Sequence, residues 1–266
     1  MLSPFLLENL ARLQLGPHAA TAPAAPAPLN ADTLPGCEMG SDDGRFWCVD
    51  RSLHSLLRED SNPARAQPCR AHPQAAEHHD DLIFLRNCYP RGALLLDLET
   101  CGFAGSAIFL IGLLHWKQGE WRLAQLLARD YSEELAILQH LHALAADKSV
   151  LVSFNGKSFD GPMIEDRRAR YRLEPCTPRL RHCDLLHHAR RRWRKQLPDC
   201  KLQTLERWIC QRQRRGDISG AQVPLAYHAY VRTGDVRALR EILHHNALDL
   251  ITLLQLAEVL MPGISS

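Results

Sequence analysis

Residues 94–102 read LLLDLETCG, an apolar run that ends in two acidic residues, Asp97 and Glu99. An extended backbone points alternate side chains to the same face, so both carboxylates project from one side of a strand. Two neighbouring carboxylates raise each other's pKa, and a divalent cation relieves that repulsion. The stretch therefore predicts a strand end that binds a divalent metal, with a solvated strand end as the alternative interpretation.

The composition is that of a globular protein. The 266 residues are 45% hydrophobic and 23% charged, enough for one substantial core with a small additional domain or arm. The net charge of +2 is too small to indicate a nucleic-acid partner, so such a partner has to be argued from local clusters of charge. The nine cysteines include no C-x-x-C pair, and we expect reduced thiols in a cytosolic protein.

No segment indicates export or a membrane. The N-terminal sequence MLSPFLLENLARLQL carries Glu8 and lacks the basic leader of a signal peptide. The longest apolar run, residues 107–114, has the length of a buried strand and is too short to span a bilayer. We therefore expect a cytoplasmic protein without membrane contacts.

Three regions differ in their pattern. Within residues 1–35, the spacing of apolar residues predicts a short amphipathic helix over residues 2–15, and the Pro/Ala-rich composition that follows predicts a linker. Residues 36–90 predict a small N-terminal extension of short strands with a helix. This extension contains a group of histidines, which we interpret as solvated, with a metal-binding tract as the alternative: His72, His78 and His79. Residues 91–262 form the main predicted domain.

The main domain predicts five strands and several helices. The strands lie at residues 94–99, 108–116, 121–127, 150–154 and 181–185. The helices lie at residues 132–146, 161–171, 186–196, 202–212, 224–232, 236–244 and 246–261. Short connections make the first three strands an antiparallel meander, whereas the fully apolar fourth strand is of the buried parallel type. The pattern predicts an α/β fold with helices on both faces of a mixed sheet.

Further acidic residues follow at the ends of later elements. Asp160 comes after the turn in SFNGKSFD, at the start of a predicted helix, and Asp249 lies in HHNALDL near the start of the last one. Either could be an ordinary surface carboxylate. Asp249 lies between Leu248 and Leu250, however, where a carboxylate needs a cation or an arginine beside it.

The four acids resemble the DEDD (DnaQ-like) 3′-to-5′ exonuclease superfamily. They follow the order Asp-x-Glu, Asp, Asp, with Asn155 and Phe159 beside the third acid as candidate nucleic-acid contacts and a histidine just before the fourth. Within this superfamily, residues 92–257 resemble the YprB-type RNase-H-like proteins. The segments that carry this resemblance are DLETCGF, LVSFNGKSFDGP, HCDLLHHARRRWR, DCKLQTLE, DISGAQVP and HHNALDL.

The resemblance implies an RNase-H-like fold, a five-stranded mixed sheet flanked by helices and followed by extra C-terminal helices. It also implies that four carboxylates bind two divalent cations, Mg²⁺ or Mn²⁺: Asp97, Glu99, Asp160 and Asp249. Hard cations prefer oxygen ligands, and two of them about 4 Å apart can hold a scissile phosphate between its attacking and leaving oxygens.

A histidine near Asp249 is expected to accept a proton from the attacking water. In the superfamily this residue is a His five places before the last Asp or a Tyr four places before it. His244 holds the first spacing and His245 the second. We favour His245, because a four-residue offset places it on the same helix face as Asp249 and because Asn246 matches the His-Asn pair of the YprB-type motif.

A basic run lies around Trp193. Arg191, Arg192 and Arg194 are expected to contact a phosphodiester backbone, and the indole of Trp193 to stack on a base. A solvated helix face is the alternative interpretation.

We therefore expect a metal-dependent nuclease, a 3′-to-5′ exonuclease that acts on single-stranded DNA or RNA. Two alternatives remain at this stage. One is a non-catalytic nucleic-acid-binding module in which the acids hold a structural cation, and the other is an endonuclease on the same fold.

Overall fold

The computed structural model describes residues 29, 34–41, 44–59, 79–102, 105–214 and 216–261. The predicted helix over residues 2–15, most of the linker that follows it, and His72 and His78 lie outside the described residues.

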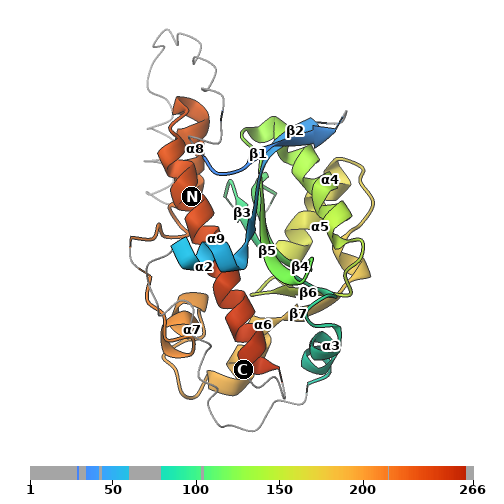
Figure 1. The fold of residues 1–266 in the computed structure, drawn as a ribbon, viewed down its shortest axis with the longest axis vertical. Helices are drawn as coiled ribbons and strands as arrows, with labels where there is room; N and C mark the ends of the chain where they lie inside the picture. The colour runs from blue at the N-terminus through green and yellow to red at the C-terminus, as the bar shows by residue number, and fades with distance from the viewer. Residues whose placement is uncertain are drawn as a thin grey trace, which may run out of the picture.

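A seven-stranded mixed sheet forms the centre of the molecule (Figure 1). Its strands are β1 (Cys37–Ser41), β2 (Gly44–Ser52), β3 (Ala93–Thr100), β4 (Ile108–Lys117), β5 (Glu120–Leu127), β6 (Val150–Ser153) and β7 (Arg181–Asp184). They are arranged in the order β1-β2-β5-β4-β3-β6-β7. The five strands expected from the sequence are β3 to β7, and their bounds agree with the prediction to within one residue at each end.

The pairing of these strands confirms the predicted mixed sheet. β3, β4 and β5 form an antiparallel meander, and β6 and β7 continue the sheet in parallel from β3. The sheet is larger than expected, because β2 pairs with β5 and β1 pairs with β2. Part of the region before residue 90 thus continues the same sheet, and the predicted domain boundary stays a prediction.

Helices cover both faces of the sheet. Among the described residues they are α2 (Leu53–Glu59), α3 (Asp80–Cys88), α4 (Glu134–Ala145), α5 (Asp160–Arg170), α6 (Leu185–Trp193), α7 (Leu202–Trp208), α8 (Val223–Thr233) and α9 (Val236–Leu260), with the short 3-10 turns η2 (Tyr131–Glu133) and η3 (Thr177–Arg179). In Figure 1, α4 and α5 lie on one side of the sheet, and α9 crosses the other. The two segments expected at residues 236–244 and 246–261 are one continuous helix, α9, because no Gly or Pro interrupts them.

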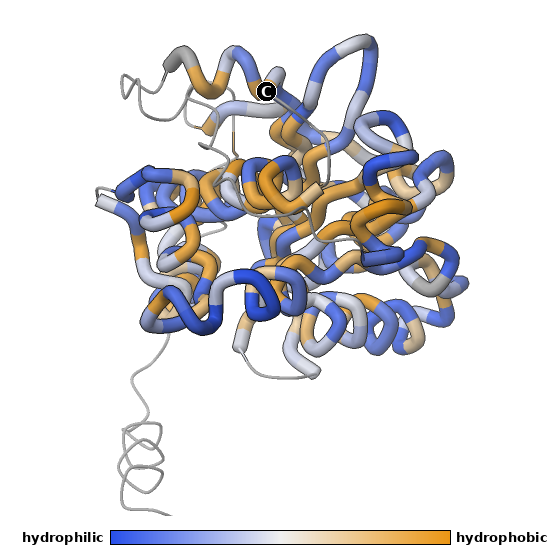
Figure 2. Tube along the Cα trace, turned by 90° about the horizontal axis from the view of Figure 1, so that it is seen from below, coloured by the Kyte–Doolittle hydropathy of each residue, from blue (hydrophilic) through white to orange (hydrophobic). Residues whose placement is uncertain are grey.

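The alternation along β3 decides which side of the sheet carries the acids. Leu94 and Leu96 belong to a buried cluster that includes residues of α4, whereas Leu95 belongs to a second cluster with the C-terminal half of α9. Figure 2 shows hydrophobic segments of the chain gathered in the interior. Asp97 and Glu99 lie two and four residues after Leu95, so they face α9.

No helix among the described residues is both long enough and apolar enough to cross a bilayer. The cysteines that the structure describes are all free thiols.

Candidate active site

The first acid of the site is held by a side chain of α9. Asp97 pairs with Gly112 across the sheet, and the amide Nδ2 of Asn246 donates a 2.8 Å hydrogen bond to Asp97 Oδ2. Gln125 on β5 sets the orientation of that amide, because its Nε2 donates to Asn246 Oδ1 at 2.9 Å and to the carbonyl of Leu243 at 2.7 Å. The amide NH₂ of Asn246 is thereby left for Asp97.

Gly112 makes this contact sterically possible. A Cβ atom at residue 112 would lie 2.1 Å from Asn246 Oδ1 and 2.6 Å from its Cγ, far inside van der Waals contact. A glycine in the middle of an apolar strand often marks such a close approach. In the sequence IFLIGLL, the glycine within the apolar run was the feature from which a close approach of another side chain could have been predicted.

Asp160 begins α5, directly after the turn that follows β6. Asn155 adopts a left-handed conformation, with φ of 65°, and its backbone N–H donates to Asp184 Oδ1 at 2.8 Å. The backbone N–H of Lys157 donates to the other oxygen of Asp184 at 3.1 Å. The buried Asp184 therefore fixes the turn that delivers Asp160 to the site, a role that the sequence did not reveal.

The last helix contributes three site residues on its buried side. His245 and Asn246 are buried, and Asp249 is half-buried one turn later. His245 Nε2 lies 3.4 Å from Asp249 Oδ2. His244 is exposed, whereas His245 is buried and contacts Asp249, and the choice of His245 as the general base stays a prediction.

The four carboxylates lie close enough to perturb one another. Burial raises the pKa of Asp97 well above its usual value, and the negative charges of Asp249, Glu99 and Asp160 raise it further. Burial also raises the pKa of Glu99 to about 8, against the opposing charge of His245, and the pKa of Asp160 to about 7. A nearby positive charge, such as a divalent cation, would favour the ionised forms of Asp97, Glu99 and Asp160.

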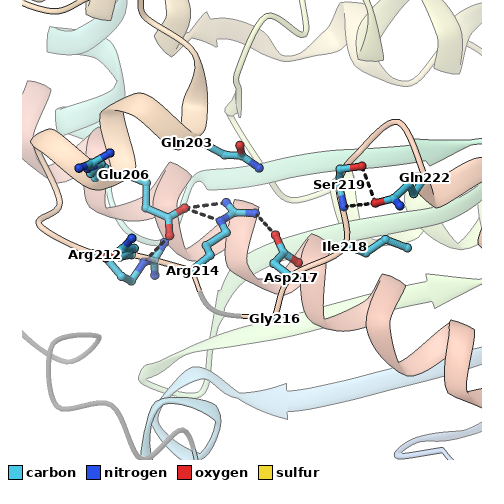
Figure 3. Close-up of a pocket in the computed structure, with 11 residues that line it drawn as sticks. Gln203, Glu206, Arg212, Arg214, Gly216, Asp217, Ile218, Ser219 and Gln222 are labelled. Carbon is cyan, nitrogen blue, oxygen red and sulfur yellow. Dashed lines mark hydrogen bonds and ion pairs between the residues drawn. The ribbon is translucent and has the colours of Figure 1, made fainter.

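Two residues that the sequence did not single out for this role complete the site, and both lie in the segment between α7 and α8 (Figure 3). Arg214 forms an ion pair with Asp249 Oδ1 and a 3.0 Å contact with Asp217 Oδ2. Asp217 Oδ2 also lies 2.9 Å from His245 Nδ1. Burial works to lower the pKa of His245, but the hydrogen bond to Asp217 and the charges of Asp249 and Glu99 outweigh it and raise that pKa.

A cavity of about 770 Å³ opens beside Asp160. Its lining is largely apolar and includes Leu98, Phe159 and Met163. Phe159 is 66% exposed, an unusual state for a large hydrophobic residue. An exposed aromatic ring at the rim of a cavity beside a carboxylate cluster can stack on a flat ligand.

The basic run around Trp193 differs from the expectation. Trp193 is only 1% exposed, so the stacking role predicted for it is wrong, because its indole packs in the core beneath α9. Arg192 is half-buried and donates to the carbonyl of Val259, ten residues beyond Asp249 and about 15 Å along the helix axis. Arg191 and Arg194 are exposed, at the end of α6 distant from the carboxylates.

A separate group of potential metal ligands lies near the start of α3. The ligand atoms of His79, Asp81 and His188 lie within 4.8 Å of one another. Asp81 already pairs with Arg181 at 2.9 Å and with Lys157 at 3.6 Å. Two neighbouring cations oppose a divalent ion, so this group is a poorer metal site than the four carboxylates.

The donor set of the candidate active site fits hard divalent cations. Its four carboxylates supply oxygen ligands, which Mg²⁺ and Mn²⁺ prefer. Burial raises the pKa values of Asp97, Glu99 and Asp160, and a bound cation would favour the charged form of each. Asp97, Glu99, Asp160 and Asp249 are therefore the residues that could hold such ions.

Comparison with known proteins gives the same fold. The chain is 33% identical over 165 residues to the uncharacterized protein YprB of Bacillus subtilis (strain 168), a match that covers 60% of this chain and 40% of YprB. The chain thus spans less than half of that relative. The family B DNA polymerase of the hyperthermophilic archaeon Pyrobaculum calidifontis shares the fold, with a TM-score of 0.53 and 15% identity over 64% of this chain and 24% of the polymerase.

The family description that matches residues 94–261 is that of the RNase_H superfamily. This segment runs from the start of the LLLDLETCG motif to the end of α9 and includes every residue of the candidate active site. The chain belongs to the RNase_H superfamily.

Proposed function

We propose that this protein is a metal-dependent nuclease that hydrolyses phosphodiester bonds, and specifically a 3′-to-5′ exonuclease on single-stranded DNA or RNA. Membership of the RNase_H superfamily indicates a nuclease-type activity. The observation that carries the finer proposal is the convergence of Asp97, Glu99, Asp160 and Asp249 around a buried histidine, His245.

Each group has a role in this proposal. Two divalent cations held by the four carboxylates would supply Lewis-acid activation of water and of the phosphodiester. His245 accepts the proton of the attacking water through Nε2, the ring nitrogen that faces Asp249. Asn246 holds Asp97 in place through its 2.8 Å hydrogen bond.

The cavity beside Asp160 supports a terminal nucleotide as the ligand. Its apolar lining suits a base, and Phe159 at the rim offers a ring on which that base can stack. Because stacking does not distinguish the sugar, this cavity suits DNA and RNA alike.

The test is cleavage by the purified protein. Wild type, Asp97→Asn and Asp147→Asn are incubated with single strands that carry a label at the 5′ or the 3′ end, with Mn²⁺ or with EDTA. Asp97→Asn keeps an acceptor for Asn246, so it should fold and lose activity, whereas Asp147 is an exposed residue in the turn before β6 and serves as the matched control.

A circular single strand separates the alternatives. An exonuclease leaves it intact and shortens the 5′-labelled linear strand one nucleotide at a time, whereas an endonuclease opens the circle. If wild type and Asp97→Asn degrade the strands equally, or neither degrades them, the proposal is refuted.

A further inference from the structure

The segment between α7 and α8 contacts the candidate active site through Arg214, which pairs with Asp249, and through Asp217, which contacts His245. Arg214 and Asp217 project from it toward α9, and both are nearly buried, with side chains that are 9% and 7% exposed. Figure 3 shows the guanidinium of Arg214 between the carboxylates of Glu206 and Asp217. Nothing in the chemistry of metal binding requires a further Arg-Asp pair here.

The contact between Asp217 and His245 fixes the position of a proton. Oδ2 of Asp217 lies 2.9 Å from Nδ1 of His245 and 3.0 Å from Nη1 of Arg214. A carboxylate only accepts hydrogen bonds and arginine only donates them. His245 must therefore donate to Asp217 through Nδ1–H, so whenever the ring is neutral its Nε2, which faces Asp249, carries no proton.

We propose that Asp217 is a positioning residue that holds His245 in the Nδ1–H tautomer, with Nε2 directed at the reacting water. This inference rests on the proposed nuclease function. Asp217 itself lies behind the imidazole and touches neither the substrate nor the four carboxylates in the proposed arrangement.

Arg214 ties this pair to the rest of the site. Its guanidinium contacts Asp217 Oδ2, Asp249 Oδ1 and Glu206 Oε2, the last at 2.7 Å from Nε. Asp249 is thereby held by one oxygen, so its Oδ2 stays on the side of His245 Nε2. Arg212 Nε in turn donates a 3.1 Å hydrogen bond to Glu206 Oε1, which holds Glu206 in position for Arg214.

A simpler role for Asp217 is to neutralise Arg214, and substitution can separate the two roles. In Asp217→Asn, the amide oxygen takes the place of Oδ2, because Arg214 and His245 both donate there. The amide NH₂ then takes the place of Oδ1, which is buried without a hydrogen-bond partner in the part of the chain that the structure describes. Asp217→Asn thus loses the charge and keeps the acceptor, whereas Asp217→Ala loses both.

The experiment reads the tautomer of His245 directly. Metal-free protein labelled with ¹⁵N-histidine is measured by NMR at a pH where the ring is neutral, and the signals are assigned with His245→Gln. We expect Nδ1–H in wild type and in Asp217→Asn, and a mixture with Nε2–H in Asp217→Ala. Thermal melts show that each variant is folded, and Asp147→Asn is the matched control.

Cleavage kinetics with Mn²⁺ complete the test. We expect kcat of Asp217→Ala to fall by about 100-fold, with KM unchanged, because a positioned general base contributes about 100-fold to 10,000-fold. We expect kcat of Asp217→Asn to fall much less, because the acceptor for His245 is kept. An Nε2–H signal in wild type, or wild-type kcat in Asp217→Ala, overturns the inference. If wild type shows the Nδ1–H tautomer but does not cleave, the contact stands and the proposed function fails.

Discussion

Gly112 on β4 and Asn246 on α9 are in such close contact that no side chain fits between them. The three heavy atoms nearest to a Cβ placed at residue 112 would all belong to Asn246, the nearest at 2.1 Å. The same asparagine donates to Asp97. A backbone position in the sheet thus controls the placement of the first carboxylate of the site.

Gly112→Ala should therefore both destabilise the protein and impair catalysis. Overpacking of this kind costs about 1–3 kcal/mol of unfolding free energy, and displacement of Asn246 removes the donor from Asp97. Urea denaturation measures the first effect and kcat the second. In the Asn246→Ala variant, Gly112→Ala should reduce the unfolding free energy far less than it does in wild type. Equal reductions in the two proteins would contradict the contact.

His245→Ala should lower kcat at saturating Mn²⁺ by about 100-fold to 10,000-fold, the usual contribution of a general base. His244→Ala should leave kcat unchanged, because His244 is exposed. Steady-state cleavage of a single-stranded oligonucleotide compares the two. A loss confined to His244→Ala would reverse the assignment.

The affinity for Mn²⁺ should rise with pH between 6 and 8. Burial raises the pKa of Glu99 to about 8 and of Asp160 to about 7, so both hold protons near neutral pH that a metal must displace. Titration calorimetry in buffers of different ionisation enthalpy measures the protons released. Glu99→Gln should release fewer of them, and an affinity independent of pH would contradict the pKa shift.

The metal-free protein should become less stable as the pH rises from about 5 to 8. In this range the unfolded chain has lost the proton of Glu99, whose usual pKa is 4.5, whereas the folded protein retains it. The folded state binds more protons, so its stability falls with increasing pH. Melting temperatures in EDTA measure this, and Glu99→Gln should show a weaker pH dependence.

Phe159→Ala should weaken the binding of single strands by about 1–3 kcal/mol, the usual contribution of one stacked base. The expected change is in KM, with a smaller effect on kcat. Trp208→Ala is the matched control, because Trp208 is 54% exposed but does not line the cavity beside Asp160. Equal effects of the two substitutions would exclude a specific stacking role for Phe159.

The sequence drew attention to the four candidate acids because each lies at a recognisable position of a helix or a strand. Asp97 and Glu99 lie in the second half of the apolar strand β3, where acidic residues alternate with leucines. Asp160 is the first residue of α5, and Asp249 lies four residues after His245 in α9. Asp217 was not predicted, because it lies in an irregular segment and only the tertiary fold brings it to His245, 28 residues later.

The burial of Trp193 could have been predicted from the spacing of apolar residues along α6, but the run of arginines around it pointed to an exposed side chain. Leu185, Ala189 and Trp193 recur at four-residue spacing, which places all three on one buried face of α6. The arginines next to Trp193 in the sequence favoured an exposed indole. The four-residue spacing of apolar residues is the better guide, because it shows which face of the helix is buried. The strands β1 and β2 were expected only as part of an extension, since pairing with β5 leaves no local signature.

The helix α9 also has a consequence for biosynthesis. It supplies Asp249, which follows Asp97 by 152 residues, and it also supplies His245 and Asn246. A growing chain that has completed the sheet still lacks the fourth carboxylate and the histidine until this helix has been synthesised and has docked. A polypeptide that has completed only the sheet therefore cannot carry out the chemistry proposed for the site.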